Sequence, residues 1–184
     1  EDNNLGEKAW DARWLRWGTC SLCEQRYHGV VSCALGWACW KTYVGRPETD
    51  QVHVSTMNRL GNGLSSAGHH ADALPVREAE LATLRRLGAS EDNLFAVQGN
   101  LASTVYKLGR FEDALRIERG VYSGRSKFLG EEHPQTLLTA NTYASSLNHL
   151  RRFEEAKALL RKTIPVARRV LGNSDITLRM RWAY

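Results

Sequence analysis

The sequence lacks any long apolar run. No stretch approaches the roughly 20 residues that a bilayer-spanning helix needs, and the longest candidate, VVSCALGWACW, is followed at once by Lys41. β-branched runs with period-two alternation, which indicate half-buried strands, are also absent. The net charge is +5, yet no run of five or more basic residues occurs. These absences disfavour a membrane protein, a sheet protein and a strongly charge-driven nucleic-acid binder, and the scattered cations are typical of solvated helix faces.

Cysteine is scarce and confined to one short segment. All four cysteines lie between Cys20 and Cys39, which does not make a disulfide framework. We therefore expect reduced thiols and a cytoplasmic setting. The chain begins at Glu1 rather than Met, so we expect a piece of a longer protein, with any targeting segment outside it.

Sequence motifs of catalysis and cofactor binding are missing as well. The six histidines show no His-Glu-x-x-His pattern, and neither a nucleophile elbow nor a phosphate-loop lysine motif occurs. We predict that the protein is not an enzyme and needs no cofactor.

What the sequence does contain is an internal repeat. Phe111 and Phe153, Ala114 and Ala156, and the Leu-Gly pairs that end at Gly130 and Gly172 are all 42 residues apart. Asp72-Ala73-Leu74 belongs to an earlier copy, and a degenerate first copy precedes it. A fixed period of this length indicates a repeat architecture.

Each copy has the pattern of two helices joined by a short turn. Residues 101–108 carry apolar or small residues at helical spacing and end at Gly109, whereas Glu112 and Asp113 suit the start of a following helix. Turns are expected near His28, His69, Arg110 and Arg151. The predicted fold class is therefore an all-α solenoid of stacked antiparallel helix pairs.

These positions resemble the tetratricopeptide repeats of kinesin light chains. The likeness rests on Leu101-Ala102, the aromatic residue at the turn (Phe111), Glu112-Asp113-Ala114-Leu115 and the Leu-Gly-x-x-His-Pro segment from Leu129 to Pro134. It implies a right-handed α-solenoid that serves as a scaffold for protein partners. It does not imply association with a motor, because the chain has no motor-binding heptad segment.

The repeat register divides the chain into six parts. They are an N-terminal segment (1–13), a degenerate first unit (14–49), three further units (50–92, 93–136 and 137–176) and the start of a truncated repeat (177–184). In this register Cys20 and Cys23 are expected on the first helix of the first unit, and Cys33 and Cys39 on the second.

Four residues of the first unit have the spacing of a zinc ligand set. Cys20, Cys23, His28 and Cys33 could supply a tetrahedral Cys-Cys-His-Cys site. The expected positions on two long helices, without the glycines of a zinc knuckle, favour small buried cysteines instead. Zinc or a redox pair remains the alternative.

The resemblance also implies a concave groove lined by the first helices. By register, its predicted residues are Arg16, Asn58, Arg59, Asn62, Ser65, Asn100, Ser103, Tyr106, Lys107, Asn141, Ser145, Asn148 and His149. Asparagine both donates and accepts hydrogen bonds, which suits the amides of an extended peptide. The alternative is that these are plain solvated positions of amphipathic helices.

The functional prediction is a scaffold that binds a peptide segment of a protein partner in this groove. Arg16, Arg59 and Lys107 favour an acidic peptide. Nucleic acid and membrane are disfavoured as partners, and the oligomeric state is left open. The alternative is a basic nucleic-acid-binding module that contains zinc at the Cys-Cys-His-Cys site.

Overall fold

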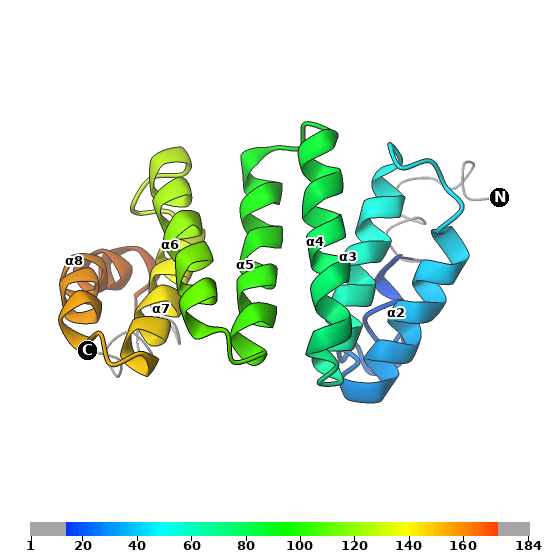
Figure 1. Ribbon diagram of the computed structural model, residues 1–184, viewed down its shortest axis with the longest axis horizontal. Helices are drawn as coiled ribbons and strands as arrows, with labels where there is room; N and C mark the ends of the chain where they lie inside the picture. Colours follow the sequence, from blue (N-terminus) through cyan, green and yellow to red (C-terminus); the bar gives the residue numbers. More distant parts are fainter. Residues whose placement is uncertain (1–13, 173–184) are drawn as a thin grey trace. The chain divides into compact units, whose positions relative to one another are not determined.

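The computed structural model describes residues 14–172, and these form seven helices (Figure 1). In chain order they are α2 (Gly29–Tyr43), α3 (Gln51–Ser66), α4 (His70–Arg86), α5 (Glu91–Lys107), α6 (Phe111–Phe128), α7 (Pro134–His149) and α8 (Phe153–Leu171). Within this range there is no strand, only an isolated bridge between Thr19 and Arg26. The predicted segments 1–13 and 177–184 lie outside the described residues.

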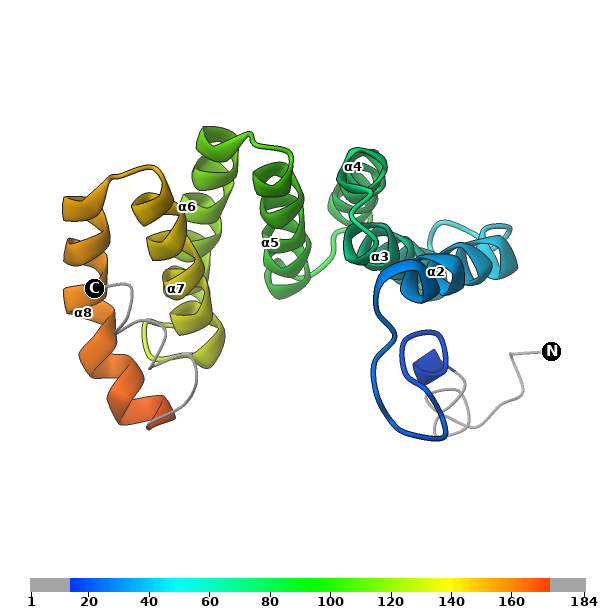
Figure 2. The ribbon, with the colours of Figure 1, turned by 90° about the horizontal axis from the view of Figure 1, so that it is seen from below.

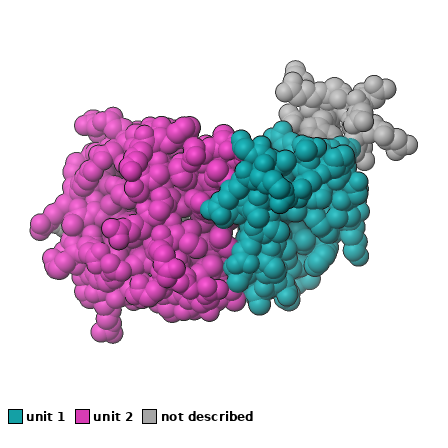
Figure 3. All heavy atoms as spheres, turned by 45° about the horizontal axis from the view of Figure 1, so that its top comes forward, with its two compact units in different colours: residues 1–88 teal, residues 89–184 magenta. Residues whose placement is uncertain are grey.

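The helices belong to two compact units, Glu1–Gly88 and Ala89–Tyr184 (Figure 3). In the first unit α3 packs against both α2 and α4. In the second unit α5 packs against α6, α6 against α7, and α7 against α8. Consecutive helices of each unit thus stack side by side, and the predicted all-α class is confirmed. The predicted boundaries between repeats stay predictions; α7, for example, begins at Pro134, before the predicted boundary at 137.

The turns within the helix pairs lie where the repeat pattern predicts them. Helices α4, α6 and α8 begin at His70, Phe111 and Phe153. The turn before α6 uses Gly109 at φ +79°, in the left-handed region that glycine adopts without steric cost. Arg151 takes the equivalent place before α8 with φ +57°, so there a side chain is held in the same backbone conformation.

Small residues set the spacing of the paired helices. Ala73, Ala114 and Ala156 are at most 1% exposed, at one position of three successive second helices. In the second unit Ala144 and Leu160 belong to a fully buried apolar cluster between α7 and α8. Side chains this small allow helix axes to approach to about 8–10 Å.

The expected first helix of the first unit is wrong. Residues 14–28 form a short turn and a loop that leads into α2 (dark blue in Figure 2). Cys20 and Cys23 therefore lie in a turn and not on a helix, while Cys33 and Cys39 do lie on α2. The cause is tertiary, because Trp14 and Trp17 pack against the ring of Tyr43, with centroids 6.1 and 6.3 Å away.

None of the helices in the described part of the chain combines the length and the apolar character that crossing a membrane requires.

Candidate functional site

The predicted groove residues lie on three helices, with one exception. Helix α3 carries Asn58, Arg59, Asn62 and Ser65, α5 carries Asn100, Ser103, Tyr106 and Lys107, and α7 carries Asn141, Ser145, Asn148 and His149. Arg16 precedes α2 in the N-terminal loop. None of these side chains is fully buried. Their assignment to a peptide-binding groove stays a prediction, but the structure shows what each of them contacts.

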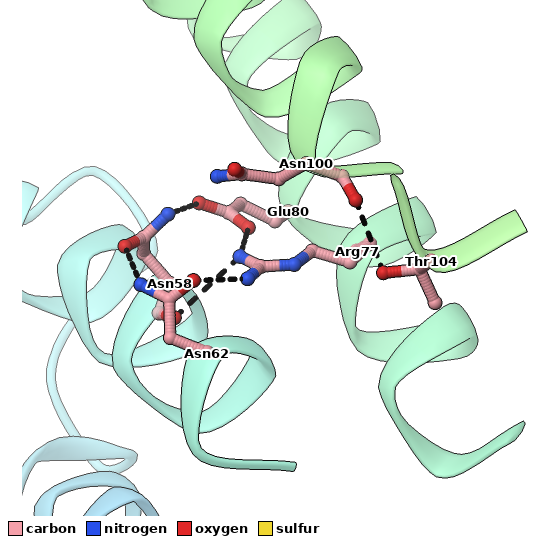
Figure 4. Close-up of polar contacts among 6 residues, drawn as sticks. All are labelled: Asn58, Asn62, Arg77, Glu80, Asn100 and Thr104. Atoms are coloured by element: carbon pink, nitrogen blue, oxygen red, sulfur yellow. Dashed lines mark hydrogen bonds and ion pairs between the residues drawn. The ribbon is translucent and has the colours of Figure 1, made fainter. Parts of the chain in front are cut away.

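On α3 the two asparagines are engaged by a buried ion pair of α4 (Figure 4). Arg77 donates to Glu80 at 3.0 Å, and these side chains are only 2% and 1% exposed. Asn58 donates to the second oxygen of Glu80 at 3.0 Å, and Asn62 donates to Asn58 at 2.8 Å and accepts from Arg77. The amides of both asparagines therefore supply partners to the pair, since a buried charge without partners is costly; only the Nε of Arg77 has none within residues 14–172.

Arg59 is covered by the N-terminal loop. Its guanidinium lies 5.7 Å from the ring centre of Trp14 and against Gly18, where an added Cβ would come within 2.1 Å of Nη1. Burial lowers the pKa of Arg59; the nearby Arg26 lowers it further, and Cys39 opposes this change. The loop and α3 enclose a pocket of about 600 Å³ that Asn58 and Arg59 help to line. Of the three cations behind the acidic-peptide prediction, Arg16 and Lys107 are exposed and Arg59 is half-buried.

In the second unit two predicted residues form part of an aromatic cluster. The ring of His149 lies 5.3 Å from that of Tyr106 and 4.4 Å from that of Phe111. Edge-to-face and tilted rings at such distances stabilise one another. Tyr106 and His149 thus contribute to packing near the turn between α5 and α6.

Another pocket, of about 410 Å³, lies between α5, α6 and α7 of the second unit. Asn100 and Ser103 line it from α5, Thr142 from α7, and Glu118 and Arg125 from α6. The Thr104 hydroxyl donates to the backbone carbonyl of Asn100 at 3.0 Å, and the side-chain amide of Asn100 takes no part in this bond (Figure 4). This pocket is the place where the structure gathers predicted groove residues around unsatisfied polar groups.

Glu118 is the one acid among the residues that line that pocket, and its carboxyl is buried. Glu118 is 5% exposed, and its Oε2 has no hydrogen-bond partner within the described chain. Burial raises its pKa to about 7, and the hydroxyl of Ser146 offsets only part of this. Arg125, 9% exposed, donates to Thr139 Oγ1 at 2.7 Å and leaves its Nε without a partner in the same range.

Sequence reasoning missed these charged residues because it assigned the groove to first helices alone. Arg77, Glu118 and Leu160 occupy one position of three successive second helices, and all three are buried. The available signal was a charged residue in α4 and in α6 at the position where α8 carries leucine. A buried charge is costly without a partner, so such a residue needs either a partner within the chain or a bound ligand.

The zinc ligand set does not come together. Among residues 14–172 no three histidine, cysteine or acidic side chains lie close enough to share a metal ion. Cys20 and Cys23 are neighbours in the turn, where the backbone N–H groups of Cys23 and Leu22 lower the pKa of Cys20 to about 7. Burial instead raises the pKa of Cys39 on α2 to about 11.

Comparison with known proteins identifies relatives with a similar sequence pattern and a similar fold. Residues 93–169 match the family model of the tetratricopeptide repeat. The kinesin light chain TPR-like repeats of Podosopora anserina superimpose with a TM-score of 0.66 at 19% identity, over 84% of this chain and 74% of that one. No curated protein matches the sequence.

Two further structures have the same fold. BtubC (BKLC) of P. vanneervenii gives a TM-score of 0.68 at 17% identity, over 81% of this chain and 61% of its own length. The Rap protein in complex with competence and sporulation factor gives 0.64 at 15% identity, over 74% of this chain and 37% of its own. Residues 93–169 thus match tetratricopeptide repeats, and the chain has an all-α solenoid fold similar to that of the kinesin light chain TPR-like repeats.

Proposed function

We propose that this tetratricopeptide-repeat chain is a protein-interaction scaffold and that the pocket between α5, α6 and α7 binds a peptide segment of its partner. The observation that carries the proposal is the set of unsatisfied polar atoms at this site. Among the residues that line the pocket, Glu118 Oε2 and Arg125 Nε are buried without a partner in the described chain, and Asn100 lines it as well; on α7 the Oδ1 of Asn141 is also buried without a partner. An amide that can donate and accept matches the backbone of an extended peptide.

The comparisons support the same class of function. Tetratricopeptide repeats ordinarily serve as binding scaffolds and not as catalysts, as expected for a fold whose stacked helices present a long continuous surface. The Rap protein, which shares the fold, was solved with a bound factor. No observation favours the zinc-containing nucleic-acid module, since Cys20, Cys23, His28 and Cys33 do not converge.

A peptide-display selection on the 184-residue chain, followed by titration of the selected peptides, tests the proposal. Replacing Asn100 and Asn141 together by alanine removes two amides, each worth about 1 kcal/mol net. Binding is then expected to weaken by about 1–3 kcal/mol, which corresponds to roughly 5- to 150-fold. Arg85→Ala, an exposed change on α4, serves as the control and should leave the affinity unchanged.

The proposal fails if no peptide is selected, or if the double variant binds as tightly as the wild type. Affinity for RNA or DNA that falls steeply with salt would instead support the nucleic-acid alternative.

A further inference from the structure

The pocket of the second unit holds two buried charged residues, Glu118 and Arg125, that do not pair with each other. Glu118 and Arg125 are seven residues apart on α6, which is about 10 Å along the axis at 1.5 Å per residue. None of the ion pairs formed within residues 14–172 includes either side chain. A buried polar group without a partner destabilises the fold, and a charged one does so more strongly.

In the first unit, by contrast, two buried charged residues pair directly with each other. There Arg77 and Glu80 are one helical turn apart, and the amides of Asn58 and Asn62 join them, although the Nε of Arg77 has no partner among the described residues. At the position of Glu118, α8 carries Leu160, which is completely buried. The fold therefore accepts an apolar residue at this position, and stability alone does not require a carboxyl there.

We propose that this pocket recognises a peptide segment with a lysine or arginine side chain against Glu118 and an acidic side chain against Arg125. The inference rests on the proposed peptide-binding function and adds the chemistry of the ligand. On an extended chain, side chains two positions apart point to the same face about 7 Å from one another. The long side chains of a cationic and an acidic residue at that spacing together span the two groups. The bound cation would lie against the carboxyl of Glu118 and the bound carboxylate against the guanidinium of Arg125, since both residues line the pocket.

The electrostatics of the pocket make this recognition depend on pH. The carboxyl of Glu118 titrates with a pKa of about 7. The titratable group that faces it from α7 is Tyr143, whose own pKa is raised by burial, so it stays neutral between pH 6 and 8. From α5 the pocket is lined by uncharged residues, and Asp92 of that helix acts on Arg125.

A cationic ligand requires the ionised form of Glu118. About one tenth of the carboxyl is ionised at pH 6 and about nine tenths at pH 8, so the apparent affinity should rise roughly tenfold over this range.

The test uses an array of ten-residue peptides and the fluorescently labelled 184-residue chain. Each peptide carries one lysine and one glutamate two positions apart, in either order, with the other positions randomised. Matched sets replace the lysine or the glutamate by glutamine. Peptides with both charges should bind best, roughly tenfold more tightly at pH 8 than at pH 6.

Variants of the chain then assign the two contacts. Glu118→Gln should remove the preference for lysine and flatten the pH dependence, and Arg125→Met should remove the preference for glutamate. Glu112→Gln, an exposed change on the same helix, is the matched control. Far-UV circular dichroism checks that each variant is folded, and Glu118→Leu offers a second variant that reproduces the residue found in α8.

The outcomes separate this inference from the proposed function. Peptides that bind and depend on Asn100 and Asn141, but show no gain from lysine or no effect of Glu118→Gln, overturn the inference and leave the scaffold role standing. Failure of every peptide to bind overturns both. A NMR titration of the Glu118 carboxyl gives an independent readout, since its pKa should fall when a lysine-containing peptide is added.

Discussion

The buried ion pair between Arg77 and Glu80 allows a sharp test of what holds the first unit together. Replacing Arg77 by methionine leaves the carboxylate of Glu80, 1% exposed, with the amide of Asn58 as its remaining donor. Breaking a buried pair from one side costs about 3–5 kcal/mol. Loss of the bond to Asn62 adds little, because that side chain is exposed and water can replace the guanidinium. We therefore expect Arg77→Met to lower the free energy of unfolding by about 3–5 kcal/mol.

The double variant Arg77→Met/Glu80→Met should recover most of this loss. Replacing both members of a buried pair by apolar residues of similar volume is often neutral or stabilising. The double-mutant cycle therefore gives a large coupling energy between the two positions. Arg85→Met, on the exposed face of the same helix, should change stability by less than about 0.5 kcal/mol.

Urea denaturation with two probes measures these effects. Five of the six tryptophans precede residue 41, so tryptophan fluorescence follows the first unit, while far-UV circular dichroism follows the helices of both. The reasoning is refuted if Arg77→Met costs less than about 1 kcal/mol, or if the cost of the double variant equals the sum of the single ones.

Three more predictions concern single positions. Gly61→Ala should destabilise the fold by about 1–3 kcal/mol, because the added Cβ would lie 2.7 Å from the Cζ of the buried Arg77 guanidinium. Gly120→Ala has open space around it and should stabilise the fold by about 0.5–1 kcal/mol in the same urea assay. Burial raises the pKa of Glu118 from its ordinary value to about 7, so its ionisation destabilises the fold as pH rises. Glu118→Leu should therefore gain roughly 2–3 kcal/mol over the wild type at pH 8 and less at pH 5, by denaturation at both pH values. Iodoacetamide at pH 7 should modify Cys20 first and Cys39 last, because only the thiolate reacts and their pKa values are about 7 and about 11; equal rates by mass spectrometry would contradict this.

The sequence by itself determined the helical architecture. A 42-residue period with small residues at Ala73, Ala114 and Ala156 leaves few arrangements other than stacked helix pairs, and turn signals such as Gly109 mark where each pair reverses. These features act locally or between neighbouring helices, which is why periodicity and turn chemistry suffice to predict them.

Only the tertiary structure decided what the polar residues do. Asn58 and Asn62 fit a ligand groove by register, yet they bond to Arg77 and Glu80, because a charge buried on the neighbouring helix competes for their amides. Residues 14–28 fit a first helix by repeat register, but Trp14 and Trp17 pack on Tyr43 and the chain loops instead. Glu118 reads in the sequence as one more helical glutamate, yet packing buries its carboxyl and raises its pKa, a rise that the Ser146 hydroxyl of α7 offsets only in part. Long-range packing sets each of these environments, and burial changes the energy of a polar group far more than any local pattern can indicate.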